Sequence, residues 1–440
     1  MSKPPKQPIH FEAFGYEPGR MKPIHFATGF FLAITGNFYR LEFLNKATVT
    51  THKDGLKEQY AADNLLDLLM SENRVSQRID VAKLNALRSQ LNATFDNDAA
   101  VFAAYAPYST FGNDYTLTSG RFVTNHKRLD GYAGYFISRV FERTDAGRAL
   151  LEIARRWIEH TGNPVEQLAE PLLDLPDSAA GWNNTYPTKF GELDDARLDE
   201  LAVRMAVQTA ASLQLCRNLE HSVPHQTKLR FLIIALSFWL ITYLIREAAR
   251  ASAEPDTPFL FMDFLGKTNS RCRAQSCASF ARHRELLYRA YPAWNQAGRF
   301  QGKEANYAEF KNEFKILEQH FSDLAVRIGM AQPRAAQAKR KHYELQPDTL
   351  RVLLTSVLQE TELADLATLA ERLKATWGVC AGACIDDHAQ LRAAGYLGLD
   401  EDEDLRLNRE AFIRLLKKLD LAIEPSDGLV LCAIDNDLFS

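Results

Sequence analysis

The sequence has few cysteines, a small net charge and no apolar leader segment. Six cysteines among 440 residues are too few for a disulfide scaffold and are typical of a chain kept in a reducing compartment. Residues 1–20 contain no apolar run that could form the core of a secretory signal. We therefore expect a cytoplasmic protein.

Charge of one sign is also scarce over the whole chain. The formal net charge is -4, and charged residues make up 25% of the sequence, which is typical of a globular protein. A protein whose whole surface binds a polyanion needs a strong excess of basic residues. Any nucleic-acid-binding surface in this chain must therefore be local.

Motifs for nucleotide binding and for ribonuclease activity are incomplete. The tripeptide Gly-Lys-Thr at 266–268 ends like a P-loop, but that loop also needs a glycine five residues earlier, where Phe261 stands. We therefore expect no nucleotide cofactor. Two Arg-x4-His pairs have the spacing of some helical ribonucleases, a match that a chain with 11 histidines reaches by chance. They are Arg121 with His126 and Arg155 with His160.

The cysteines do not have the spacing of a metal site. Cys272 and Cys277 are separated by four residues, and Cys380 and Cys384 by three. Zinc sites use tighter Cys-x-x-Cys turns or combine cysteine with histidine. We expect free thiols and no bound metal.

The longest apolar run is FLIIALSFWLITYLI, residues 231–245, flanked by Arg230 and Arg246. As a helix it would rise about 22 Å, which is less than the roughly 30 Å of a bilayer's hydrocarbon core. A helix that is apolar on every side is typical of the centre of a large soluble domain. We predict a buried core helix and no membrane association.

The composition divides the chain into a helical body and a small C-terminal module. Residues 1–23 are rich in proline and glycine, which predicts an extended arm. Residues 24–331 are expected to form a mainly helical domain with a few short strands, and residues 25–51 within it to form short strands or irregular core segments. Small and basic residues bounded by two prolines indicate a linker over 332–346, and residues 347–440 follow as a separate domain.

The clearest helical pattern in the body runs from 307 to 328. Apolar side chains recur at alternating spacings of three and four, which is a heptad-type seam. Such a seam usually packs inside a helical hairpin, and the alternative is a partner helix from another chain. Its members are Tyr307, Phe310, Phe314, Leu317, Phe321, Leu324 and Ile328.

Residues 347–440 have the order of elements of a winged helix. Pro347 is expected to open a helix, Asn408 to cap a helix over 408–421, and the apolar runs around 425–428 to form a β-hairpin. Several helices followed by a hairpin resemble a winged-helix module. It carries nine Lys or Arg against eighteen Asp or Glu, a net charge of -9. This charge would repel a nucleic-acid duplex and favours docking to a protein.

The segment 265–303 is the basic region of the chain. It holds eight Lys or Arg against one acidic residue, Glu285, with aromatic residues interleaved. Arginines near aromatic side chains suit contacts with phosphates and bases. The alternative is a helix face whose charges pair with acidic residues elsewhere in the fold. The residues that we expect to contact nucleic acid are Lys267, Arg271, Arg273, Arg282, Arg284, Arg289, Lys339, Arg340 and Lys341.

A large helical body with a terminal winged-helix-like module resembles the accessory subunits of bacterial anti-phage defence systems. The resemblance carries over no site residues. It implies a non-enzymatic, nucleic-acid-associated subunit of a multi-protein complex, whose basic segment contacts phosphates and whose acidic module docks a partner protein. Two alternatives stay open. One is a nuclease whose site is assembled from dispersed residues such as Asp263 and Lys267, and the other is a purely structural interaction subunit.

Overall fold

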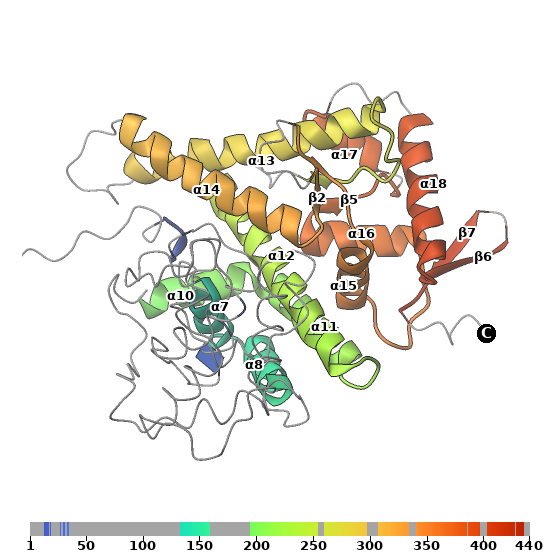
Figure 1. The fold of residues 1–440 in the computed structure, drawn as a ribbon, viewed down its shortest axis with the longest axis horizontal. Helices are drawn as coiled ribbons and strands as arrows, with labels where there is room; N and C mark the ends of the chain where they lie inside the picture. Colours follow the sequence, from blue (N-terminus) through green and yellow to red (C-terminus); the bar gives the residue numbers. More distant parts are fainter. Residues whose placement is uncertain are drawn as a thin grey trace, which may run out of the picture. The chain divides into compact units, whose positions relative to one another are not determined.

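Helices dominate the structure (Figure 1). Of the residues described by this computed structural model, 68% are helical and the strands are short, which confirms the mainly α class. Contacts divide the chain into two compact units, the first formed by 1–200 and 225–230 and the second by 201–224 and 231–440. The described residues are 133–158, 194–253, 259–296, 307–333, 340–384, 386–396, 403–426 and 428–434, with isolated positions between 13 and 34.

The first unit contains α7 (Ala133–Phe141), α8 (Asp145–Ile158) and the start of α10 (Asp195–Arg204). Gly147 lies against the end of α7, where a Cβ would clash with the carbonyl oxygen of Phe141. Arg143, in the turn between α7 and α8, forms an ion pair with Asp195 at the start of α10. Because a Cβ at position 147 has no room, the close contact between the start of α8 and the end of α7 requires glycine.

The expectation of short strands or irregular core segments within 25–51 is wrong at the described positions of that segment. Ala27, Phe30, Ala33 and Ile34 are helical, and the rest of 25–51 lies outside the described residues. Ala27, Phe30 and Ile34 are buried and are spaced three and four apart, which is the period of one helix face. The aromatic composition suggested strands, but this spacing matches the observed helix.

The second unit is built around α12 (His225–Ala251). Every residue from 231 to 245 is buried, and the rings of Trp239 and Tyr243 stack with 5.6 Å between their centroids. The prediction of a buried core helix is confirmed.

The length of α12 corrects the argument that led to this prediction. The helix has 27 residues, because polar residues on both sides continue it beyond the apolar run. Its span Thr227–Ala251 is long and apolar enough to cross a membrane by length and composition. The observation that decides is burial, since 89% of its most apolar window is covered inside the structure. The absence of membrane association stays a prediction.

Helices from both ends of the second unit pack around α12. α11 (Ala206–Leu219) packs against α15 (Pro347–Val357), which begins at Pro347 as expected. The side-chain amide of Asn218 on α11 donates to the carbonyl oxygens of Thr355 and Leu358, at 2.7 and 2.8 Å. α16 (Leu366–Trp377) meets α12 through Trp377, whose ring stands edge-on to that of Phe238.

The heptad seam packs within the chain. α13 (Arg271–Gln296) and α14 (Tyr307–Arg327) form a pair in which the ring of Phe280 meets that of Phe321, and the ring of Tyr288 that of Phe314, with centroids 5.5 and 4.8 Å apart. Leu317, Phe321, Leu324 and Ile328 of the seam are buried. This part of the seam is therefore not a free surface for a partner helix.

Short strands tie the C-terminal residues to the body. β1 (Leu260–Phe261) pairs in parallel with β5 (Val379–Cys380), and β2 (Ala331–Gln332) pairs antiparallel with β3 (His342–Tyr343). The expected linker at 332–346 thus begins in the paired strand β2 and contains the paired strand β3, and both strands belong to the second unit. A third sheet has the strand order β4–β7–β6, formed by β4 (Ala364–Asp365), β7 (Leu429–Cys432) and β6 (Ala422–Ser426).

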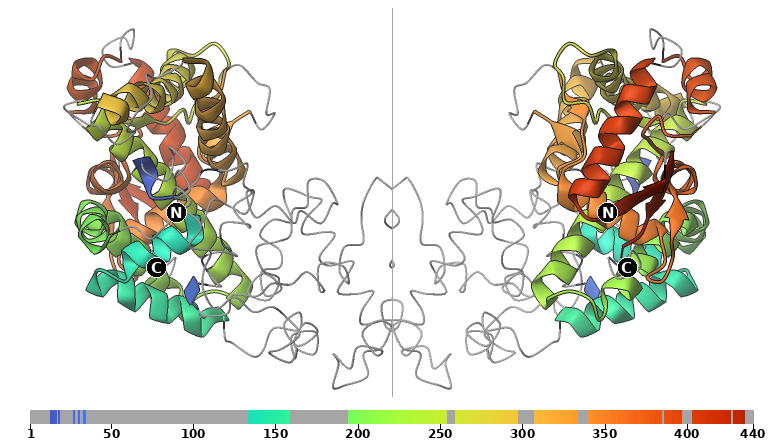
Figure 2. Two further views of the ribbon diagram at one scale, coloured as in Figure 1. Left: turned by 90° about the vertical axis from the view of Figure 1, so that its left-hand side faces the viewer. Right: turned by 90° about the vertical axis from the view of Figure 1, so that its right-hand side faces the viewer.

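α17 (Asp387–Ala393) and α18 (Glu403–Lys418) complete the C-terminal part, and the β6–β7 hairpin lies beside α18 (Figure 1, Figure 2). Asn408 does not cap α18, which begins five residues earlier. It is fully buried inside the helix, where its amide donates to the carbonyl oxygens of Met262 and Ala381 and accepts from the N–H of Phe264. A residue type that often caps helices here joins α18 to the segments that follow β1 and β5.

Candidate functional site

The basic segment begins in an exposed loop before α13. Residues 266–269 are exposed, and Gly266 adopts a φ of 67°, which allows the chain to turn out of β1. The Ser270 hydroxyl then accepts a hydrogen bond from the N–H of Arg273 and caps the helix. Lys267 is exposed, and the side chain of Arg271 is 52% exposed with Asp404 at 3.7 Å. These two cations stand at the start of a helix.

Three of the residues expected to contact phosphates are used inside the fold. Arg273 pairs with Asp263 and Glu344, Arg282 donates to the carbonyl oxygen of Ala394, and Arg284 pairs with Glu318. Burial lowers the pKa of Arg284. The alternative that the sequence left open, pairing with acidic residues from elsewhere, therefore describes Arg273 and Arg284.

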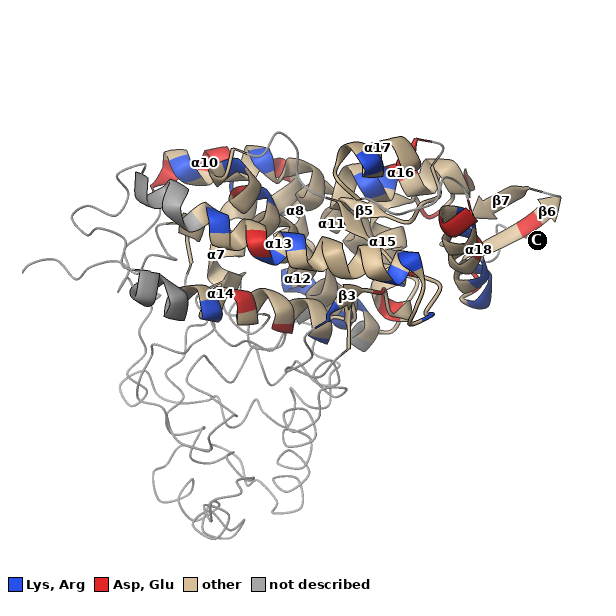
Figure 3. Ribbon diagram, turned by 90° about the horizontal axis from the view of Figure 1, so that it is seen from above, with Lys and Arg blue, Asp and Glu red and all other residues tan. Residues whose placement is uncertain are grey.

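The remaining basic positions are divided in the same way. Arg289 lies on the surface of α13 and pairs with Glu285 one turn earlier. Arg340 is exposed, whereas Lys341 is buried, donates to the carbonyl oxygen of Pro333 at 3.1 Å, and has a pKa lowered by burial. Lys339 lies outside the described residues. Figure 3 shows residues of both signs along α14, whereas α13 carries several arginines and one acidic residue, Glu285.

A buried polar cluster lies beside the start of α13. Asp263, His342 and Glu344 bring one potential metal ligand atom each within 4.8 Å of one another. Asp263 is fully buried, and Glu344 is 31% exposed. The guanidinium of Arg273 donates to both carboxylates and lies 3.4 Å from Nδ1 of His342. The cluster therefore combines two carboxylates, one imidazole and one fixed cation.

The hydrogen bonds of this cluster form a consistent set. Nε2 of His342 lies 3.1 Å from Oε2 of Glu344, so a neutral imidazole can donate there and accept from Arg273 at Nδ1. The hydrogen bond from His342, with the positive charge of Arg273, lowers the pKa of Glu344. Since the guanidinium of Arg273 already binds both carboxylates, a metal ion would have to displace it. The geometry therefore fits an ion-pair network better than a metal site.

The sequence named one member of this cluster and missed the others. Asp263 was a candidate nuclease ligand, but its expected companion Lys267 is exposed, and the cluster is completed by residues about eighty positions later. The available signal was the spacing of His342 and Glu344. Residues two apart on a strand point to the same face.

The cysteines of the two pairs are free thiols. Cys272 and Cys380 are buried in one apolar cluster with Phe261 and Tyr396. Burial raises the pKa of Cys272 to about 12 and that of Cys384 to about 11. Since metal binding needs the thiolate, these surroundings oppose it.

Comparison with protein-family models, with curated proteins and with solved structures finds no match to this chain.

Proposed function

We propose that the protein is a non-enzymatic, nucleic-acid-associated subunit of a bacterial multi-protein complex, of the kind found in anti-phage defence. The observation that carries the proposal is the exposed start of α13. Lys267 and Arg271 are exposed there, and the first turn contains no acidic residue. A helix N-terminus with two cations favours a phosphate. Arg289 and Arg340 would extend the contact.

In this proposal the C-terminal part is a winged-helix-like module that docks a protein. The support is the order α15–β4–α16–β5–α17–α18–β6–β7, with a three-stranded sheet in which β7 lies between β4 and β6. A winged helix has this succession of helices and a hairpin without the inserted β5 and α17. The net charge of -9 over 347–440 favours a basic protein surface as the partner.

The test compares two sets of four substitutions with the same change of charge. In the first, Lys267, Arg271, Arg289 and Arg340 become glutamine. In the second, the exposed cations of α18 become glutamine, namely Arg406, Arg409, Arg414 and Lys418. Binding of a labelled oligonucleotide is measured by fluorescence anisotropy at several salt concentrations, with single and double strands.

We expect the first set to weaken binding and to flatten the dependence of log affinity on log salt, by about 0.7 to 0.9 for each phosphate that is no longer neutralised. The second set should leave both unchanged. Loss of binding in the second set alone would make α18 the nucleic-acid-reading helix. If the wild-type chain binds neither strand form at low salt, the proposal fails and a structural interaction subunit takes its place.

A second candidate function is a metal-dependent phosphodiesterase at Asp263, His342 and Glu344, favoured by the convergence of their ligand atoms. Cleavage of a labelled oligonucleotide with Mg²⁺ or Mn²⁺, abolished by Glu344→Gln and unaffected by Arg289→Gln, would support it. No cleavage by the folded wild-type chain with either ion would exclude these two metals as cofactors.

A further inference from the structure

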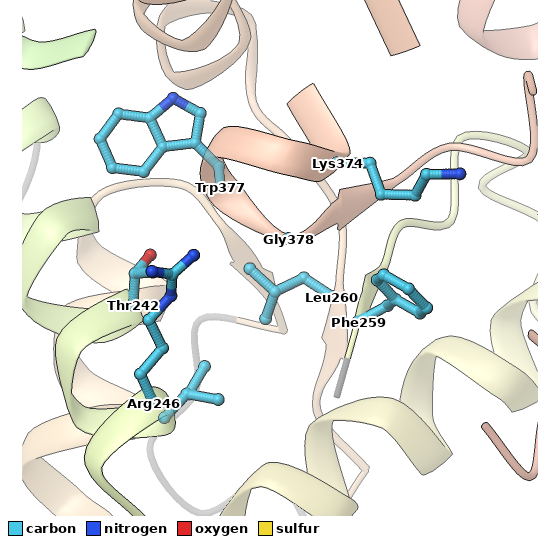
Figure 4. A pocket seen from close by; sticks show the side chains of 8 residues that line it. Thr242, Arg246, Phe259, Leu260, Lys374, Trp377 and Gly378 are labelled. Carbon is cyan, nitrogen blue, oxygen red and sulfur yellow. The ribbon is translucent and has the colours of Figure 1, made fainter. Parts of the chain in front are cut away.

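A cavity of about 160 Å³ lies in the second unit between α12, β1 and the α16–β5 connection. An apolar cavity of about 150 Å³ is large enough to hold a benzene ring. Figure 4 shows the side chains that line this one. They are Thr242, Ile245, Arg246, Phe259, Leu260, Lys374, Trp377 and Gly378.

One wall of this cavity has a hydroxyl group without a partner. The side chain of Thr242 is in the core, with the residue only 5% exposed, and its hydroxyl makes no hydrogen bond with any described residue. A buried hydroxyl that lacks a partner destabilises a fold, so nearly all such groups are satisfied in native proteins. Thr242 lines the cavity, and a ligand there could provide the partner.

Arg246 stands one helical turn after Thr242 and supplies a positive charge to the same wall (Figure 4). Its guanidinium donates to the carbonyl oxygen of Arg204 at 3.2 Å and has no acidic partner among the described residues. The nearest acid in sequence, Glu247, pairs with Arg204 and Arg250 instead. Burial lowers the pKa of Arg246, as expected for a cation without a counter-charge.

The other walls provide an apolar surface and no second free charge. The ammonium group of Lys374 pairs with Asp387 at 2.8 Å, and Figure 4 shows it directed away from Arg246. The indole N–H of Trp377 donates to the hydroxyl of Ser356, which leaves the ring as an apolar wall. The Gly378 carbonyl already accepts from the N–H of Leu260. The uncompensated charge of the cavity is therefore the single positive charge of Arg246.

We propose that this cavity binds a small organic monocarboxylate. The carboxylate would accept hydrogen bonds from the Arg246 guanidinium and the Thr242 hydroxyl, and a planar or apolar body would lie against Trp377 and Leu260. A single negative charge balances Arg246, whereas a phosphate dianion would bring a second charge that nothing free in the described walls compensates. Guanidinium and carboxylate also match in geometry.

The experiment uses the full chain and two isosteric probes, benzoate and benzamide, in isothermal titration calorimetry. We expect benzoate to bind at one site per chain and benzamide at least tenfold more weakly, because it lacks the charge that Arg246 requires. Arg246→Gln should abolish benzoate binding. Arg250→Gln, which removes a charge from an exposed position one turn later, should leave it unchanged.

Thr242→Val separates ligand binding from a structural role. It replaces the hydroxyl with a methyl group of the same size, so we expect the protein without ligand to keep or gain thermal stability while benzoate binds several-fold more weakly. A loss of stability without a change in affinity would assign Thr242 to the fold. Three results would each overturn the proposal: equal binding of benzoate and benzamide, no benzoate binding at millimolar concentration, or saturable binding of inorganic phosphate in place of benzoate. None of these results depends on nucleic-acid binding.

Discussion

Substitution of Asn408 tests the tie between α18 and the body of the second unit. Asn408→Ala leaves three buried backbone groups without a partner: the N–H of Phe264 and the carbonyls of Met262 and Ala381. Each unsatisfied group costs about 1 to 3 kcal/mol. The sum for three groups is about 3 to 9 kcal/mol. We expect the lower half of this range, about 3 to 6 kcal/mol, because a water in the vacated space can satisfy one of them.

The assay is urea denaturation of the full chain, with Arg409→Ala as the control because that neighbouring side chain is exposed. The control should change the free energy of unfolding by less than about 0.5 kcal/mol. Asn408→Asp should be as harmful as Asn408→Ala at neutral pH, since a carboxylate cannot donate to the two carbonyls. Protonation restores one donor, so part of the lost stability should return at acidic pH. If Asn408→Ala unfolds at the same urea concentration as Arg409→Ala, the three hydrogen bonds do not hold α18 in place.

Further predictions concern the first unit, the ion-pair cluster and the linker. Gly147→Ala should lower the melting temperature measured by calorimetry, because its Cβ would clash with the carbonyl oxygen of Phe141; an unchanged melting temperature would contradict this close approach. Glu344→Gln should lower the free energy of unfolding at a pH above the ordinary carboxyl pKa near 4.5, because the folded state lowers the pKa of Glu344. The difference from the wild type should vanish as the pH falls from there through the lowered pKa. A pH-independent difference in urea titrations would refute the charge contribution. If trypsin cuts within 334–341, the two pieces should co-elute in gel filtration, because β1 pairs with β5 across the cut; separate elution would establish 347–440 as an independent domain.

The sequence was most informative where apolar residues repeat. The run 231–245 predicted a core helix, and the seam of α14 predicted a packed helix. Burial of apolar surface is the main favourable term in the free energy of folding, so the residues that are buried form a regular apolar pattern in the sequence. Ala27, Phe30 and Ile34 have the spacing of a helix face, but the aromatic and β-branched composition around them indicated short strands or irregular segments.

Polar residues were harder to interpret, since their roles depend on partners far away in the sequence. The composition of 265–303 could not show that Arg273 would meet Glu344 or that Arg284 would meet Glu318, because each pair depends on the packing of separate elements. Asn408 is of a residue type that often caps helices, but its side chain forms hydrogen bonds between α18 and the segments that follow β1 and β5. For the cavity there was a weak signal, since Thr242 is a hydroxyl inside an otherwise apolar run and Arg246 follows it within one turn.

The packing of Trp377 against Phe238 affects the synthesis of the chain. α12 ends at Ala251, and Trp377 is the 126th residue after it. The ribosome must therefore add 126 residues to α12 before this tryptophan is part of the chain. At roughly 5 to 20 residues per second this takes about 6 to 25 s. Throughout that interval the most apolar helix of the described chain lacks part of its cover. We therefore expect the nascent chain to bind chaperones that hold apolar helices, and truncation before residue 377 to convert a folded protein into an aggregating one.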